Sequence, residues 1–163
     1  MKRHEPAEMK LDDLYQEVIL DHNRSPRNFK RPEGTNAEAH GVNPLCGDDY
    51  HLYLKKSAEG TMEAVGFLGQ GCAISKSSAS IMTTMIEGKS SAEAERLKEA
   101  FIRLLTRDTV PSEDRQLLGR LKIFEGVKQY PVRVKCATLI WRALEAALKN
   151  SAKREVSTER TEP

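Results

Sequence analysis

The feature of this sequence that most constrains its fold is a change of apolar periodicity at Cys72. Before it, three short segments have strand character: "TNAEAHGV", "DYHLYLKK" and "MEAVGFLG". The second alternates apolar and polar residues, so Tyr50, Leu52 and Leu54 should share one face of a sheet. A turn at "AEG" leads into the third segment. Together the three predict an antiparallel meander with one covered face.

Helical patterns surround this strand region on both sides. Residues 10–22 carry apolar side chains at helical spacing, and so do residues 74–85. Ser90 and Glu93 have the spacing of a capping box, which predicts the start of a further helix. A proline in the first turn suits a last helix over residues 131–149. The connection before that helix has room for one short helix.

The length of 163 residues is enough for one domain with a real core. We find no internal repeat or linker, so residues 1–149 are predicted to form a single domain. Residues 150–163 are polar and lack periodicity, which predicts a disordered tail. The basic residues of segment 24–31 predict either a solvated loop or a docking surface for an acidic partner.

Composition narrows the functional classes. The net charge of +2 is too balanced to predict nucleic-acid binding. The N-terminal stretch lacks the apolar core of a signal peptide, and no apolar run approaches the roughly 18 residues that span a membrane. Three cysteines make an odd number for a disulfide framework. We therefore expect a cytoplasmic protein with free thiols and no membrane partner.

Each cysteine falls at the boundary of a predicted element. Cys46 lies in the turn between the first two strands, Cys72 opens a helix, and Cys136 lies near the start of the last helix. The positive end of a helix dipole favours thiolate over thiol. Cysteines that only fill a core are more often found inside an element. These positions therefore favour metal ligands or nucleophiles.

Asp48 adds a carboxylate two residues after Cys46, and the intervening Gly47 permits a turn that aims both side chains at one ion. Three thiolates and one carboxylate form a four-ligand set that suits zinc. The residues alone leave this open, because Asp48 is also an ordinary turn residue. The chain has no C-x-x-C pair, which favours a functional site with a displaceable ligand over a structural one.

Two more residues are candidates near the thiols. Arg133 lies three residues before Cys136, where its charge would favour thiolate, although a surface salt bridge is an equal alternative. His40 is the best reserve ligand. His51 falls on the polar face of its strand, and His22 is expected to pack in the core.

Four segments resemble the U-type iron–sulfur cluster assembly family, and most closely its SufU branch. They are "LYQEVILDHNRSPRNF", "AHGVNPLCGDDYHLYL", "GFLGQGCAISKSSASIM" and "YPVRVKCATLIWRALEAAL", which together span most of residues 14–148. The related scaffold branch has a histidine immediately before its last cysteine, where this chain has Lys135. Here 63 residues, 73–135, separate Cys72 from Cys136, and residues 105–125 resemble the SufU insertion. These departures favour sulfur transfer over a scaffold role.

The resemblance implies an α+β fold in which a small three-stranded antiparallel sheet packs against helices, as in SufE- and IscU-like proteins. It implies zinc bound by Cys46, Asp48, Cys72 and Cys136. It also implies a SufS-type cysteine desulfurase as the partner, whose histidine replaces one cysteine on zinc. Cys46 then matches the acceptor of persulfide sulfur, which passes toward SufBCD-like assembly proteins. Arg133 matches a residue linked to function in this branch.

Two other functional hypotheses use the same residues. In one, the chain is a scaffold that assembles a [2Fe–2S] cluster on the four ligands. In the other, it is a structural zinc module that docks partners through segment 24–31. A brown protein after anaerobic purification would favour the scaffold, and a colourless zinc protein would favour sulfur transfer.

Overall fold

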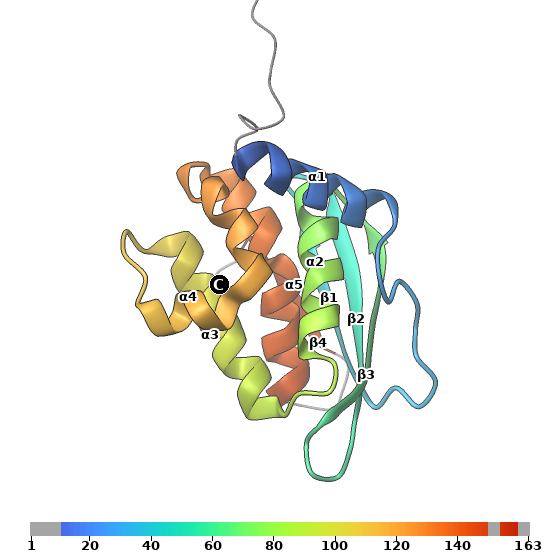
Figure 1. Cartoon of the computed structure of the whole chain (residues 1–163). Coiled ribbons are helices and arrows are strands. Elements are labelled where there is room, and N and C mark those ends of the chain that lie inside the picture. The colour runs from blue at the N-terminus through green and yellow to red at the C-terminus, as the bar shows by residue number, and fades with distance from the viewer. Residues whose placement is uncertain (1–10, 150–153, 160–163) are drawn as a thin grey trace, which may run out of the picture.

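A computed structural model of the chain describes residues 11–149 and 154–159 (Figure 1). Helix α1 (Leu11–Arg24) precedes three strands, β1 (Ala37–Asn43), β2 (Asp48–Lys56) and β3 (Met62–Gln70). The helices α2 (Ala73–Ile86), α3 (Ser91–Thr106) and α4 (Ser112–Leu118) follow. The 3₁₀ helix η2 (Gly119–Gln129), helix α5 (Pro131–Lys149) and strand β4 (Arg154–Ser157) complete the fold.

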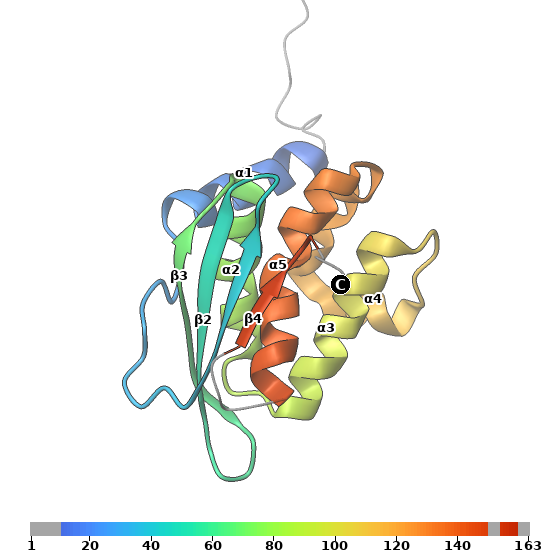
Figure 2. The ribbon, with the colours of Figure 1, turned by 180° about the vertical axis from the view of Figure 1, so that it is seen from behind.

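The sheet has the order β3-β2-β1-β4. The first three strands are antiparallel, and β4 runs parallel to β1 at the edge. In the view from behind, the sheet lies in front of α2 and α5, so helices cover one face while the other stays open (Figure 2). The α+β class and the antiparallel meander are therefore confirmed, but the sheet is mixed and has four strands instead of three.

The core lies between the sheet and the helices. Tyr50, Leu52 and Leu54 are fully buried on the inner face of β2, as the alternation predicts. The Trp141 indole of α5 donates to the Ser78 hydroxyl of α2, with 3.1 Å between Nε1 and Oγ. This buried hydrogen bond fixes the two helices that carry Cys72 and Cys136 relative to each other.

The helix boundaries agree closely with the sequence. Ser90 and Glu93 form both hydrogen bonds of the capping box before α3, and Pro131 opens α5. The buried His22 of α1 lies 2.7 Å from the Ser80 hydroxyl of α2, which confirms its expected place in the core. No helix among the residues described here is long and apolar enough to cross a membrane.

The predicted disordered tail is wrong for residues 154–157, which form β4. Its sequence has no strand periodicity, but the open edge of β1 supplies backbone partners, so that His40 pairs with Glu155. Val156 also packs against the core, and Lys135 of α5 holds Glu159 with 2.6 Å between Nζ and Oε2. Residues 150–153 and 160–163 lie outside the described part of the chain, and the single domain over 1–149 stays a prediction.

Candidate metal centre

A tight hairpin turn sets the geometry of Cys46 and Asp48. The backbone carbonyl of Asn43 accepts hydrogen bonds from the N–H groups of Cys46 and Gly47, at 3.2 and 2.9 Å. Gly47 has a φ of +74°, which an L side chain rarely adopts. The turn leaves Cys46 exposed, while Asp48 begins β2 and is 2% exposed on its inner face.

The buried carboxylate of Asp48 accepts hydrogen bonds from three donors, which belong to β1 and to the N-terminus of α2. The Cys72 backbone N–H and the Ser75 hydroxyl donate to Oδ1, each at 3.0 Å. The Asn43 side-chain amide donates to Oδ2, also at 3.0 Å. Donors of this kind stabilise an ionised carboxylate in a buried position and fix its orientation. The β1–β2 hairpin and the N-terminus of α2 are thereby joined at Asp48.

Gly71 allows this close approach. A Cβ at this position would lie 2.5 Å from Asp48 Oδ1, 2.6 Å from Ser75 Oγ and 2.7 Å from the Tyr50 hydroxyl. No real Cβ tolerates such contacts. The backbone before Cys72 therefore forms part of the wall of the site.

The thiols differ in burial and in direction. The candidate ligand atoms of Cys46, Asp48 and Cys136 all lie within 4.8 Å of one another. Cys136 is 3% exposed, in the second turn of α5. Cys72 is the N-cap of α2, where its Sγ accepts from the Ser75 N–H at 3.4 Å. The structure thus brings three of the four predicted ligands together, and its Cys72 thiol caps α2.

The electrostatics of this cluster call for a cation. Burial raises the pKa of the Cys136 thiol well above its ordinary value, and the Cys46 thiol and the negative charges of Cys72 and Asp48 raise it further. Burial also raises the pKa of Tyr50. The nearby Asp48, Cys72 and Cys136 raise this pKa further, and the hydrogen bond with Ser75 opposes the rise. Several sulfurs and a carboxylate converge here, and no cation is among the groups that change the pKa values of Cys136 and Tyr50. The donor set therefore fits a metal ion that prefers thiolate and carboxylate.

The other two candidates make contacts with residues outside this cluster. The guanidinium of Arg133 stacks over the Tyr130 ring, 4.6 Å from its centroid, at the exposed start of α5. His40 groups with Asp49 and His51 on the outer face of the sheet, not with the cysteines. Its reserve role at the thiol cluster has no support in this geometry, and the role of Arg133 stays a prediction.

The sequence interpretation missed the polar residues that support the site. Asn43 donates to Asp48 and, at 3.5 Å, to the sulfur of Cys136. The side-chain amide oxygen of Asn43, Oδ1, accepts a hydrogen bond from the Thr158 hydroxyl at 2.9 Å. The position of Asn43 directly before the Pro-Leu-Cys-Gly turn is the sequence signal that could have identified it as a supporting residue. The sequence around Thr158 carries no such signal.

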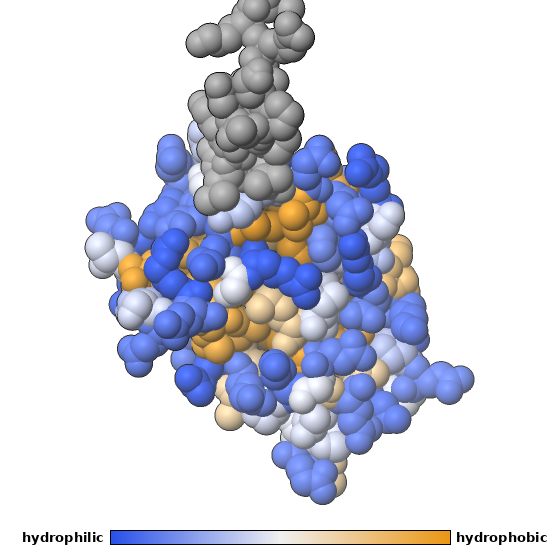
Figure 3. Space-filling view, viewed as in Figure 1, coloured by the Kyte–Doolittle hydropathy of each residue, from blue (hydrophilic) through white to orange (hydrophobic). Residues whose placement is uncertain are grey.

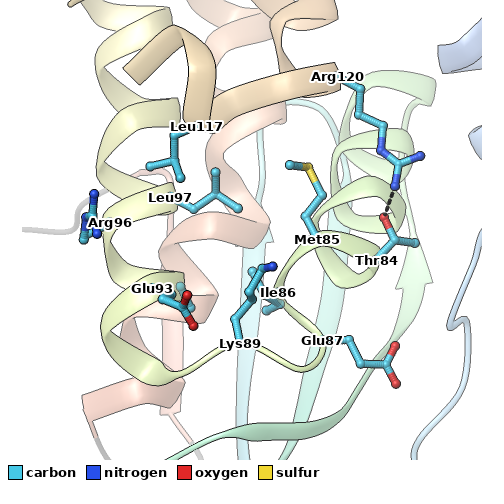
Figure 4. Close-up of a pocket in the computed structure, with 11 residues that line it drawn as sticks. Thr84, Met85, Ile86, Glu87, Lys89, Glu93, Arg96, Leu97, Leu117 and Arg120 are labelled. Atoms are coloured by element: carbon cyan, nitrogen blue, oxygen red, sulfur yellow. Dashed lines mark hydrogen bonds between the residues drawn. The ribbon is translucent and has the colours of Figure 1, made fainter. Parts of the chain in front are cut away.

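A separate pocket of about 400 Å³ lies at the end of α2 away from Cys72. In Figure 4 the Arg120 guanidinium donates to the Thr84 hydroxyl beside it, at 3.2 Å, and Met85, Leu97 and Leu117 supply apolar walls. Its described lining includes none of the predicted site residues. On the helical face of the molecule, hydrophilic residues cover most of the surface and apolar patches lie between them (Figure 3).

Together the fold and the site define a small α+β domain that presents thiols and one carboxylate at the end of a hairpin. The chain belongs to the family described as the NifU-like N terminal domain, which matches residues 14–137.

Relatives extend along most of the chain. It is 37% identical to the iron–sulfur cluster assembly scaffold protein IscU of Streptococcus pyogenes serotype M1, over 92% of each chain. It is 39% identical to the zinc-dependent sulfurtransferase SufU of Bacillus subtilis (strain 168), over 89% of this chain and 94% of that one. A crystal structure of a SUF-system protein from the thermophile Fervidobacterium islandicum AW-1 matches with a TM-score of 0.76 and 32% identity, over 85% of this chain and 99% of the other.

Proposed function

We propose that this protein acts in iron–sulfur cluster assembly as a zinc-dependent sulfur acceptor. Zinc would be held by Cys46, Asp48, Cys72 and Cys136, and the sulfur would come from the persulfide of a SufS-type cysteine desulfurase. The SufU relative carries the name of this activity at 39% identity. The departures at Lys135 and in the spacing of the last two cysteines support the same branch.

The observation that carries the proposal is the contrast between Cys46 and its neighbours. Cys46 is exposed in a four-residue turn, while Asp48 and Cys136 are 2% and 3% exposed and fixed by hydrogen bonds and helix packing. The Cys46 thiol can therefore move toward a partner while Asp48 and Cys136 stay in place. Exposed apolar side chains flank the cysteines in sequence, since Leu45 is 63% and Val132 is 52% exposed. Such residues suit contact with a protein partner.

Bound zinc would keep the thiols deprotonated and would add no redox chemistry of its own. The Cys46 thiolate then forms a bond to the terminal sulfur of the donor persulfide. The donor's S–S bond breaks, and its electron pair leaves on the donor cysteine as a thiolate. The product is a persulfide on Cys46, and the exchange needs no oxidant or reductant. Asn43, which donates to Cys136 and Asp48, would hold the remaining ligands during this step.

Cys72 has to shift to join the other ligands, because its sulfur caps α2 and lies outside the group formed by Cys46, Asp48 and Cys136. The Ser75 N–H then loses its partner. It lies in the first turn of α2, where water can accept its hydrogen bond. The cost of losing an N-cap is about 1 kcal/mol. That is small beside the free energy of zinc binding to thiolates, which is about 10 kcal/mol or more.

The test combines metal analysis with a desulfurase assay. We expect about one zinc per chain, faster turnover of a SufS-type desulfurase in the presence of the protein, and a persulfide on Cys46 by mass spectrometry. Cys46→Ala should abolish activation, whereas Glu59→Ala in the exposed β2–β3 turn should keep it. Full activation by Cys46→Ala would refute the acceptor role.

The second candidate is a scaffold that assembles a [2Fe–2S] cluster on the same ligands. The IscU relative, at 37% identity over 92% of the chain, favours it. Anaerobic purification separates the two functions. Sulfide-to-iron charge-transfer absorption in the visible range would support the scaffold, and a colourless protein with stoichiometric zinc would support sulfur transfer.

A further inference from the structure

Adjacent aspartates at the start of β2 point to opposite faces of the sheet. Asp48 faces inward to the cysteines, and Asp49 faces the open side, as strand alternation requires. On that open side of the sheet, which faces the viewer in Figure 2, His40 pairs with both Asp49 and Glu155, and His51 lies close to His40 and Asp49. These four residues, His40, Asp49, His51 and Glu155, form what we call the outer-face cluster.

The outer-face cluster is fixed by strand register. His51 of β2, His40 of β1 and Glu155 of β4 are direct partners across three neighbouring strands. The two imidazole rings stack with their centroids 4.2 Å apart and their planes within 3° of parallel. Candidate ligand atoms of His40, Asp49 and His51 all lie within 4.8 Å of one another. For both rings to direct a nitrogen at the point that faces Asp49, they would have to tilt out of this stack.

His40 has two distinct carboxylate partners. Its Nε2 lies 2.7 Å from Asp49 Oδ1, and its Nδ1 lies 3.0 Å from Glu155 Oε2. In metal sites a ligating histidine commonly donates its other ring N–H to a carboxylate, which fixes the tautomer and raises the basicity of the ligating nitrogen. Glu155 is placed to accept from Nδ1 of His40 in this way, which leaves Nε2 as the nitrogen that would bind the ion.

The charges also suit a divalent ion. Both carboxylates make their ion pair with the same residue, His40. A dication bound between His40 and Asp49 would match the charge of the two carboxylates. Solvent ions can reach the position, since the side chains of Asp49 and Glu155 are 49% and 69% exposed.

We propose that the outer-face cluster is a second divalent-cation site, distinct from the thiol centre on the other face of the sheet. His40 Nε2, a ring nitrogen of His51 and a carboxylate oxygen of Asp49 are the ligands, and Glu155 orients His40. Two imidazoles and one carboxylate suit a first-row ion such as Zn²⁺ or Fe²⁺ and leave positions open for water. Such a site exchanges its ion more readily than a thiolate site. The proposal does not depend on what the thiols do.

The experiment is a Zn²⁺ titration of the full chain, continued past the first equivalent and followed by NMR of the imidazole nitrogens. We expect signals of His40 and His51 to shift together in the step assigned to this site. His22, buried and bonded to Ser80 in another layer, is the internal control and should not shift. Because imidazole nitrogens report the binding, occupancy of the thiol centre does not confuse the result.

Substitutions separate ligation from surface charge. Asp49→Asn should weaken this step at least tenfold, and Glu155→Gln should weaken it about tenfold or more through the tautomer of His40. Glu38→Gln removes a carboxylate from the same face of β1 and should leave it unchanged. The proposal is overturned if Zn²⁺ leaves both histidines unshifted, or if Glu38→Gln weakens binding as much as Asp49→Asn does. In that case the cluster is held together by its hydrogen bonds and ion pairs alone.

Discussion

Asn43→Ala is the sharpest test of how the fold supports the thiol centre. Asn43 is fully buried and exposes no atom to an incoming partner. It supplies one of the three hydrogen bonds to the Asp48 carboxylate, and it donates to the sulfur of Cys136 as well. Alanine removes both donations and also the acceptor of the Thr158 hydroxyl. The perturbation therefore acts from inside the protein, through groups around the metal ligands and through the contact with Thr158.

The magnitude follows from the charge on Asp48. A hydrogen bond to a charged group contributes about 1.5–3 kcal/mol to stability, and the two remaining donors to Asp48 stay in place. We expect the free energy of unfolding of the metal-free protein to fall by about 2 kcal/mol. Zinc affinity should fall about 10- to 100-fold, as it does when an outer partner of a metal ligand is lost.

Chemical denaturation measures the first quantity, and competition with a chelator measures the second. Asn36→Ala is the matched control, because Asn36 also makes two hydrogen bonds between β2 and the chain leading into β1, but in an exposed position at the other end of the hairpin. It should cost about 1 kcal/mol or less and leave zinc affinity unchanged. Equal zinc affinity in the wild-type protein and Asn43→Ala would refute the reasoning.

Three other outcomes test the structure. Gly71→Ala should destabilise the protein by about 1–3 kcal/mol and reduce zinc retention, because its Cβ would lie 2.5 Å from a carboxylate oxygen, whereas Gly126→Ala meets nothing within 4 Å and should do neither. Burial holds the pKa of His22 below its ordinary value of about 6.5. The unfolded chain therefore binds more protons, so the free energy of unfolding should fall as pH drops below about 6.5, with a weaker dependence in His22→Gln. In metal-free protein an alkylating reagent should modify the exposed Cys46 first and the buried Cys136 last, as peptide mapping over time would show.

Local patterns predicted most of the fold because they report on local forces. The alternation in β2 and the capping box of Ser90 and Glu93 each depend on residues a few positions apart, and the structure confirms both. Strand β4 could not be predicted in this way. Its four residues carry no periodic signal, and the strand exists because β1 offers an unpaired edge at that place. That edge is a property of the folded sheet.

The candidate site likewise has features that local sequence predicts and contacts that only the folded chain creates. The turn around Gly47 and the boundary positions of the cysteines are visible in the sequence, so the ligand candidates could be proposed from it. Asn43, Ser75 and the Cys72 backbone converge on Asp48, although Cys72 and Ser75 are 24 and 27 positions away from it, and no local pattern encodes this.

The pair Asp48–Asp49 shows what the tertiary structure adds to a recognised motif. In sequence the two aspartates are adjacent, and Asp48 is the one that directly follows Cys-Gly. The register of β1 and β2 places Asn43 opposite Asp48 and His40 opposite His51, so the partners of each aspartate are fixed by the same ladder. A shift of one residue would exchange the two faces and give the cysteines Asp49 instead. The hairpin register, set by the four-residue turn that carries Cys46, therefore determines both which aspartate faces the thiols and which one faces the histidines.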